Sequence, residues 1–136
     1  MRMETDLHAL LPVLTEVIES GGEFLIYPRG DSMMPLIRPA KDGVYLVAPT
    51  RLKRNDVCLY RRENGQFVLH RLIKKRADGT LLMRGDNQTS TEVLQPSDVI
   101  ARACAVKKGE QRKRPNGFFY LLTHCSALAR RLRFQK

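Results

Sequence analysis

The sequence predicts a mainly β protein, an antiparallel β domain with one amphipathic helix at its N-terminus and another at its C-terminus. Two turn signals, Asn64-Gly65 and Asp78-Gly79, each separate two runs of β-forming residues, and such dipeptides are strong indicators of hairpins. At both ends of the chain, apolar residues recur instead at intervals of three and four, which is typical of amphipathic helices. A chain of 136 residues is expected to form a single domain.

Residues 1–22 are expected to form the N-terminal helix. Asp6 can cap the start of this helix, and Gly21-Gly22 can end it. Pro12 falls inside the pattern, and we expect it to bend the helix or to move its true start to the C-terminal side. The apolar positions at helical spacing are Leu7, Leu10, Leu11, Leu14, Val17 and Ile18.

Residues 23–106 are expected to form the β core. Short runs rich in β-branched and aromatic residues alternate here with turn residues, as in antiparallel sheets. The predicted strands span residues 24–27, 43–48, 56–61, 67–73, 80–84 and 99–106.

Residues 107–136 are expected to form a basic linker and the C-terminal helix. A Pro-Asn-Gly sequence at 115–117 breaks the chain, and apolar residues at 118–132 then return to helical spacing. The segment holds nine lysines and arginines against one acid, Glu110, so it carries +8 of the net charge of +10. Such a segment can attract nucleic acid, anionic lipid or an acidic peptide, or can be a solvated tail. We favour packing of the apolar stripe on the β domain over a role as a peripheral membrane anchor.

The composition indicates a soluble cytoplasmic protein. The longest apolar stretches are far shorter than the roughly 20 residues of a membrane-spanning helix. The first residues include acids where a signal peptide would carry positive charge. Peripheral association with the inner membrane surface, through the basic C-terminal helix, is kept as an alternative.

Neither disulfides nor a cofactor is expected. The three cysteines, Cys58, Cys104 and Cys125, lie on apolar segments and are odd in number, which indicates reduced thiols. The three histidines are scattered, and no pair of cysteines or histidines has the short spacing of a zinc site.

Ser32 and His70 are the candidate catalytic residues. Ser32 lies in the sequence GDSMMP at 30–35, where the glycine and proline predict a tight bend that can expose the hydroxyl. His70 lies in the β-like run FVLHRLI at 67–73. A serine hydroxyl attacks at neutral pH only when a base takes its proton, and imidazole has a suitable pKa. Taken alone, Ser32 favours an ordinary surface turn and His70 an ordinary strand histidine; only their combination with a third motif favours a catalytic pair.

A third block, RGDNQ at 84–88, completes an ordered set of three motifs. With these blocks, residues 24–106 resemble the signal peptidase and self-cleaving repressor group of serine peptidases. The resemblance implies that fold for the β domain, with Ser32 as nucleophile and His70 as general base, since histidine is the base in the endoplasmic-reticulum type. It makes Asp86 a candidate for orienting the imidazole, although an aspartate in this context can also stabilise the turn.

The resemblance also bears on the substrate. In signal peptidases a serine two positions before the nucleophile often donates to the oxyanion; Gly30 occupies that position here, so backbone amides would have to serve. We expect Gly30, Asp31, Met33 and Met34 to contact the substrate. The chain resembles small stand-alone members of the group that occur with machinery for modified peptides, which implies a leader peptide as substrate.

Three functions therefore compete. The first is a serine endopeptidase that cleaves a peptide or leader segment bound in extended form beside a strand. The second is a non-catalytic peptide-binding module of the same fold, which would have no need of both Ser32 and His70. The third is a nucleic-acid-associated regulator that uses the basic tail, although the chain lacks tryptophan and a helix-turn-helix pattern. We favour the first, with a peptide or protein as partner and no nucleic acid.

Overall fold

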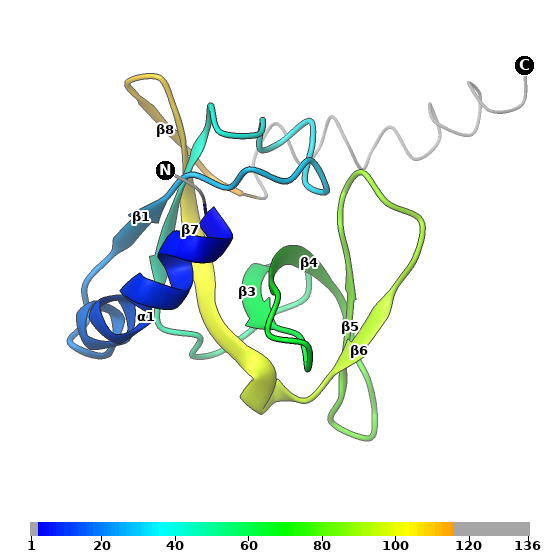
Figure 1. The fold of residues 1–136 in the computed structure, drawn as a ribbon. Coiled ribbons are helices and arrows are strands. Elements are labelled where there is room, and N and C mark those ends of the chain that lie inside the picture. Colours follow the sequence, from blue (N-terminus) through cyan, green and yellow to red (C-terminus); the bar gives the residue numbers. More distant parts are fainter. Residues whose placement is uncertain (1–2, 116–136) are drawn as a thin grey trace, which may run out of the picture.

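The computed structural model describes residues 3–115 of the chain. Within this range, an antiparallel sheet of eight strands is accompanied by one α-helix at the N-terminal end (Figure 1). The prediction of a mainly β, antiparallel protein with an N-terminal helix is confirmed. The predicted C-terminal helix lies outside the described residues.

Helix α1 spans Met3–Glu19, within the expected range of 1–22, and starts before the expected cap at Asp6. Asp6 lies inside it rather than at its cap, and the helix continues through Pro12 without a shift of its start. Pro12 lies on the exposed side, where water can satisfy the carbonyl that loses its amide partner.

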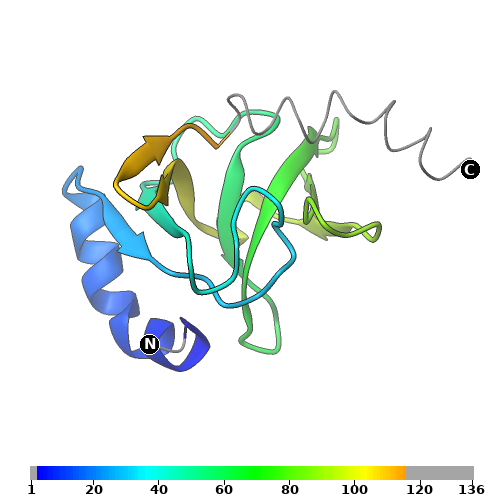
Figure 2. The same ribbon diagram turned by 90° about the horizontal axis from the view of Figure 1, so that it is seen from above.

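The glycine pair ends α1 as predicted. Gly21 adopts a φ of 90°, which favours glycine, and the Gly22 amide donates to the Val17 carbonyl at 2.9 Å. Figure 2 shows α1 beside β1 at one edge of the molecule. Among residues 7–19 of the helix, the buried apolar side chains are those of Leu7, Leu14 and Ile18.

Six of the eight strands fall on predicted runs, with ends within two residues of those expected. The two others, β6 and β8, are each only three residues long, too short to show the apolar alternation that marks a strand. The strands are β1 Phe24–Ile26, β2 Gly43–Val47, β3 Val57–Arg61, β4 Phe67–Lys75, β5 Leu81–Arg84, β6 Glu92–Leu94, β7 Val99–Lys108 and β8 Gln111–Lys113.

The segment after residue 106 corrects one prediction. A linker was expected to begin at 107, but β7 continues to Lys108 and turns back into β8, which pairs with it. Gly109, with a φ of 62°, makes this turn possible. Lysines and arginines are common on exposed edge strands, so the basic composition concealed a hairpin.

Strand pairing leaves one edge of β4 uncovered. The sheet order is β1-β2-β7-β3-β4-β5-β6, with β8 beside β7. Strand β3 pairs with β4 from Phe67 to Arg71, whereas β5 pairs with β4 only from Arg71 onward. Among the described strands, none pairs with the second edge of residues 67–70, and His70 lies in this stretch.

Alternation along β3 and β4 divides the core into two clusters. Leu59 and Leu69 belong to one cluster, with α1, whereas Tyr60 and Val68 belong to the other. Since side chains of a strand alternate between faces, His70 lies on the side of Tyr60.

No helix in the described range is long and apolar enough to cross a membrane.

Candidate active site

Ser32 lies in the loop between β1 and β2. Apolar side chains that follow Ser32 anchor this loop to the core. Three nearby side chains, Met33, Leu36 and Ile37, are at most 3% exposed and belong to the core cluster that contains α1. The Ile37 amide also donates to the Met33 carbonyl at 3.0 Å. The apolar residues that follow Ser32 therefore fix the loop to the core and leave the half-buried serine above it.

The Gly-Asp-Asn block docks on the other side of this loop. The backbone amide of Asn87 donates to the Ser32 carbonyl at 2.8 Å, and the Asn87 side chain donates to the Asp31 carbonyl at 3.2 Å. Gly85 packs against Ser32 so closely that a β-carbon there would lie 2.6 Å from the Ser32 carbonyl oxygen. The first and third motifs noted in the sequence thus meet at the serine.

Gly85→Ala is expected to displace Ser32. The added methyl would overlap backbone atoms, which cannot rotate away, so we expect a loss of about 1–3 kcal/mol in unfolding free energy. Urea unfolding measures this loss. Gly30→Ala is the matched control, because a β-carbon there meets nothing within 4 Å. Equal stability of the two variants would show that the Gly85 contact does not constrain the loop.

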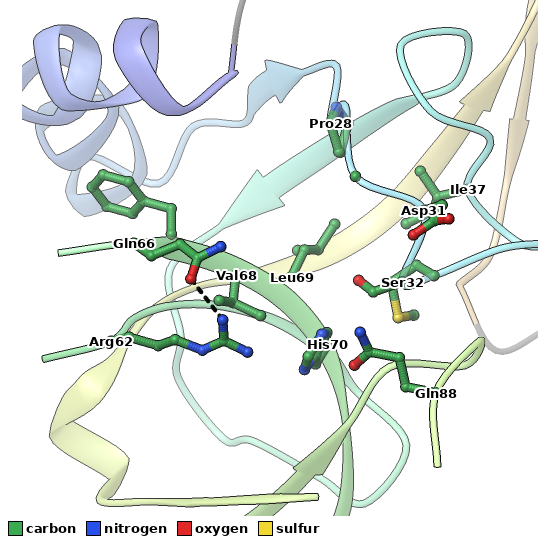
Figure 3. Close-up of a pocket in the computed structure, with 13 residues that line it drawn as sticks. Pro28, Asp31, Ser32, Ile37, Arg62, Gln66, Val68, Leu69, His70 and Gln88 are labelled. Carbon is green, nitrogen blue, oxygen red and sulfur yellow. Dashed lines mark hydrogen bonds between the residues drawn. The ribbon is translucent and has the colours of Figure 1, made fainter. Parts of the chain in front are cut away.

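Ser32 and His70 line the same pocket, which has a volume of about 220 Å³. The Ser32 loop forms one wall, and residues 67–70 of β4 form the other; Figure 3 shows Ser32 and His70 facing the space between them. Within residues 3–115 the Ser32 hydroxyl makes no hydrogen bond to the imidazole. Such bonds are often long before substrate binds, so the shared pocket is the informative feature.

A hydrogen-bond network holds the far side of the imidazole. His70 Nδ1 lies 3.0 Å from the Tyr60 hydroxyl, which donates to Glu92 Oε1 at 2.8 Å. Arg62 Nε donates to Glu92 Oε2 at 3.0 Å, and Arg62 Nη2 donates to Oε1. None of these three partners was predicted from the sequence. The hairpin around Asn64-Gly65 could have placed Tyr60 near His70, but β6, only three residues long, gave no comparable signal for Glu92.

Burial determines the charge states in this network. It lowers the pKa of His70, and Arg62 adds to this effect, while Glu92 and Asp86 oppose it only in part. Hydrogen bonding by Arg62 lowers the pKa of Glu92. Burial, and then the bond to Glu92, raises the pKa of Tyr60. At neutral pH the site therefore holds a neutral imidazole, a carboxylate and a protonated phenol.

Asp86 does not bind the imidazole as the sequence suggested. Its two carboxylate oxygens accept from Arg71 Nε and Nη2, each at 2.8 Å, and both side chains are at most 2% exposed. Arg71 follows His70 on β4 and so projects from the opposite face. A buried guanidinium binds a carboxylate with two charge-assisted bonds, which a neutral imidazole cannot match.

The residues expected to contact the substrate are placed unequally. Gly30, Asp31 and Met33 line the pocket, whereas Met34 is not among its lining residues. Met33 is also a core residue, and its Sδ accepts the Asp86 amide at 3.4 Å. Eight further lining residues were not expected from the sequence, among them Arg62, Gln66, Phe67 and Gln88.

Neither of the two described thiols lines the pocket. Cys58 and Cys104 are free thiols, and burial raises the pKa of Cys58 to about 12; Cys125 lies outside the described residues. In the described range, no group of three or more histidines, cysteines or acids is arranged to hold a metal ion.

Comparison of the chain with protein-family models finds no match. Comparison with curated proteins likewise finds none.

Proposed function

We propose that this protein is a serine endopeptidase of the signal peptidase-like type, with Ser32 as nucleophile and His70 as general base. One observation carries the proposal: Ser32 and a buried imidazole line the two walls of one pocket. With Nδ1 bonded to Tyr60, Nε2 is the nitrogen left for the serine. The lowered pKa of His70 keeps it neutral, which a base requires.

The chemistry is acyl transfer. Ser32 Oγ attacks the scissile carbonyl while His70 Nε2 takes its proton, and the imidazolium then protonates the leaving amine. A water molecule, deprotonated by the same nitrogen, releases the acyl group. Because Gly30 has no side chain, backbone amides such as that of Ser32 would bind the oxyanion.

The substrate is a peptide in extended form, such as a leader segment. Residues 67–70 of β4 have a strand on one side only, and this uncovered edge forms a wall of the pocket. An extended peptide can pair with such an edge through its backbone, while pockets select its alternate side chains. Apolar lining from Ile37, Phe67 and Leu69 favours apolar substrate side chains near the cleavage site.

A fluorophosphonate probe tests the proposal directly. We expect the wild type to be labelled on Ser32, as shown by peptide mass mapping, and Ser32→Ala to lose this label. Ser20→Ala is the control and should be labelled as the wild type is, since the Ser20 hydroxyl donates to the Val17 carbonyl at the end of α1. Labelling that persists in Ser32→Ala would refute the proposal. A binding-only module would bind peptides and take no label.

A further inference from the structure

We propose that Tyr60 and Glu92 are positioning residues that hold His70 in its Nδ1–H tautomer, so that the lone pair of Nε2 is directed at Ser32. The inference deepens the proposed function and rests on it for its catalytic meaning. It starts from the chain of contacts from His70 through Tyr60 to Glu92, which Arg62 completes at its far end.

The protons along this chain fix the tautomer. Arg62 can only donate, and the ionised Glu92 can only accept. Tyr60 has one proton, which it donates to Glu92 Oε1, so its oxygen is left to accept at Nδ1. A short contact of 3.0 Å between the Tyr60 oxygen and Nδ1 then requires Nδ1 to carry the hydrogen. The neutral imidazole has a single hydrogen, so Nε2 is the basic nitrogen.

Glu92 acts on His70 mainly through Tyr60. Its Oε1 lies 3.7 Å from Nδ1, too far for a hydrogen bond, but close enough to stabilise the imidazolium that forms when His70 takes a proton. The other charged groups that affect the imidazole are Arg62, which disfavours the cation, and Asp86, which favours it. Tyr60 is fully buried, so water does not compete for its hydroxyl.

Glu92 is positioned beside Tyr60 by the edge strand β6. Glu92 pairs with Met83 of β5 at the end of the sheet, and Arg62, just beyond the end of β3, binds both carboxylate oxygens. A bidentate guanidinium fixes the direction of a carboxylate as well as its charge. The sheet and Arg62 thus hold the acceptor in place before any substrate binds.

The imidazole nitrogen NMR spectrum reports the tautomer without any need for activity. We expect ¹⁵N-labelled protein to show His70 protonated on Nδ1 at neutral pH. In Tyr60→Phe we expect a shift towards the Nε2–H form, which an unconstrained histidine side chain prefers. In Glu92→Gln we expect the His70 pKa to fall further, because the favourable carboxylate is lost. Tyr45→Phe is the control and should change neither.

Kinetics provides the second readout. Tyr60→Phe should lower kcat by about 10²–10⁴-fold with little change in KM, since substrate contacts remain. A wild-type His70 in the Nε2–H form, or a tautomer unaffected by Tyr60→Phe, would overturn the inference. If the tautomer depends on Tyr60 while the wild type neither cleaves peptides nor takes the probe, the proposed function is wrong and the structural assignment of Tyr60 and Glu92 still holds.

Discussion

Ser32→Ala is expected to lower peptide turnover by at least about 10⁴-fold, because the attacking oxygen is removed. His70→Gln should cause a similar loss, since an amide cannot take the serine proton. Glutamine is preferred to alanine at this position because His70 is only 3% exposed and bonded to Tyr60, so a truncated side chain would leave a cavity. Both variants should keep a melting temperature close to that of the wild type.

The double variant tests whether the two residues act together. A nucleophile and its base form one unit, so the loss in Ser32→Ala combined with His70→Gln should equal that of either single variant. Single-turnover rates on one peptide substrate provide the comparison. A double variant that is slower by the product of the two single losses would show that His70 does not activate Ser32.

Asp86→Asn is expected to lower the free energy of unfolding by about 3–5 kcal/mol, because it removes the carboxylate that compensates the buried charge of Arg71. The Arg71 side chain has no exposed surface, and one of its N–H groups would face the new amide N–H₂. Urea unfolding monitored by circular dichroism measures the loss. Glu23→Gln is the control, because its ion pair with Arg112 is exposed and should contribute little.

A second substitution separates two roles for Asp86. If the carboxylate serves the Arg71 pair, the apolar double variant Arg71→Met with Asp86→Leu should recover much of the stability lost in Asp86→Asn. The structure favours this role through the two bonds to Arg71. Unchanged stability of Asp86→Asn together with a large loss of turnover would instead favour the role in orienting His70 that the sequence suggested.

The local features of this protein could be predicted from its sequence. Helical spacing, the Gly21-Gly22 stop and two hairpin signals depend on residues close together in the chain, and each predicted its element to within a few residues. The motif around Ser32 and the strand around His70 could also be identified in this way. Strands as short as β6 leave no such local pattern, so they were missed.

Which side chains meet depends instead on the tertiary structure. The sequence offered Asp86 as the partner of His70, but strand alternation turns Arg71 towards Asp86 and His70 towards Tyr60. Glu92 reaches Tyr60 across 32 residues of sequence, through the pairing of β5 with β6. Contacts of this kind depend on strand register and order, which many residues fix together and no short motif encodes.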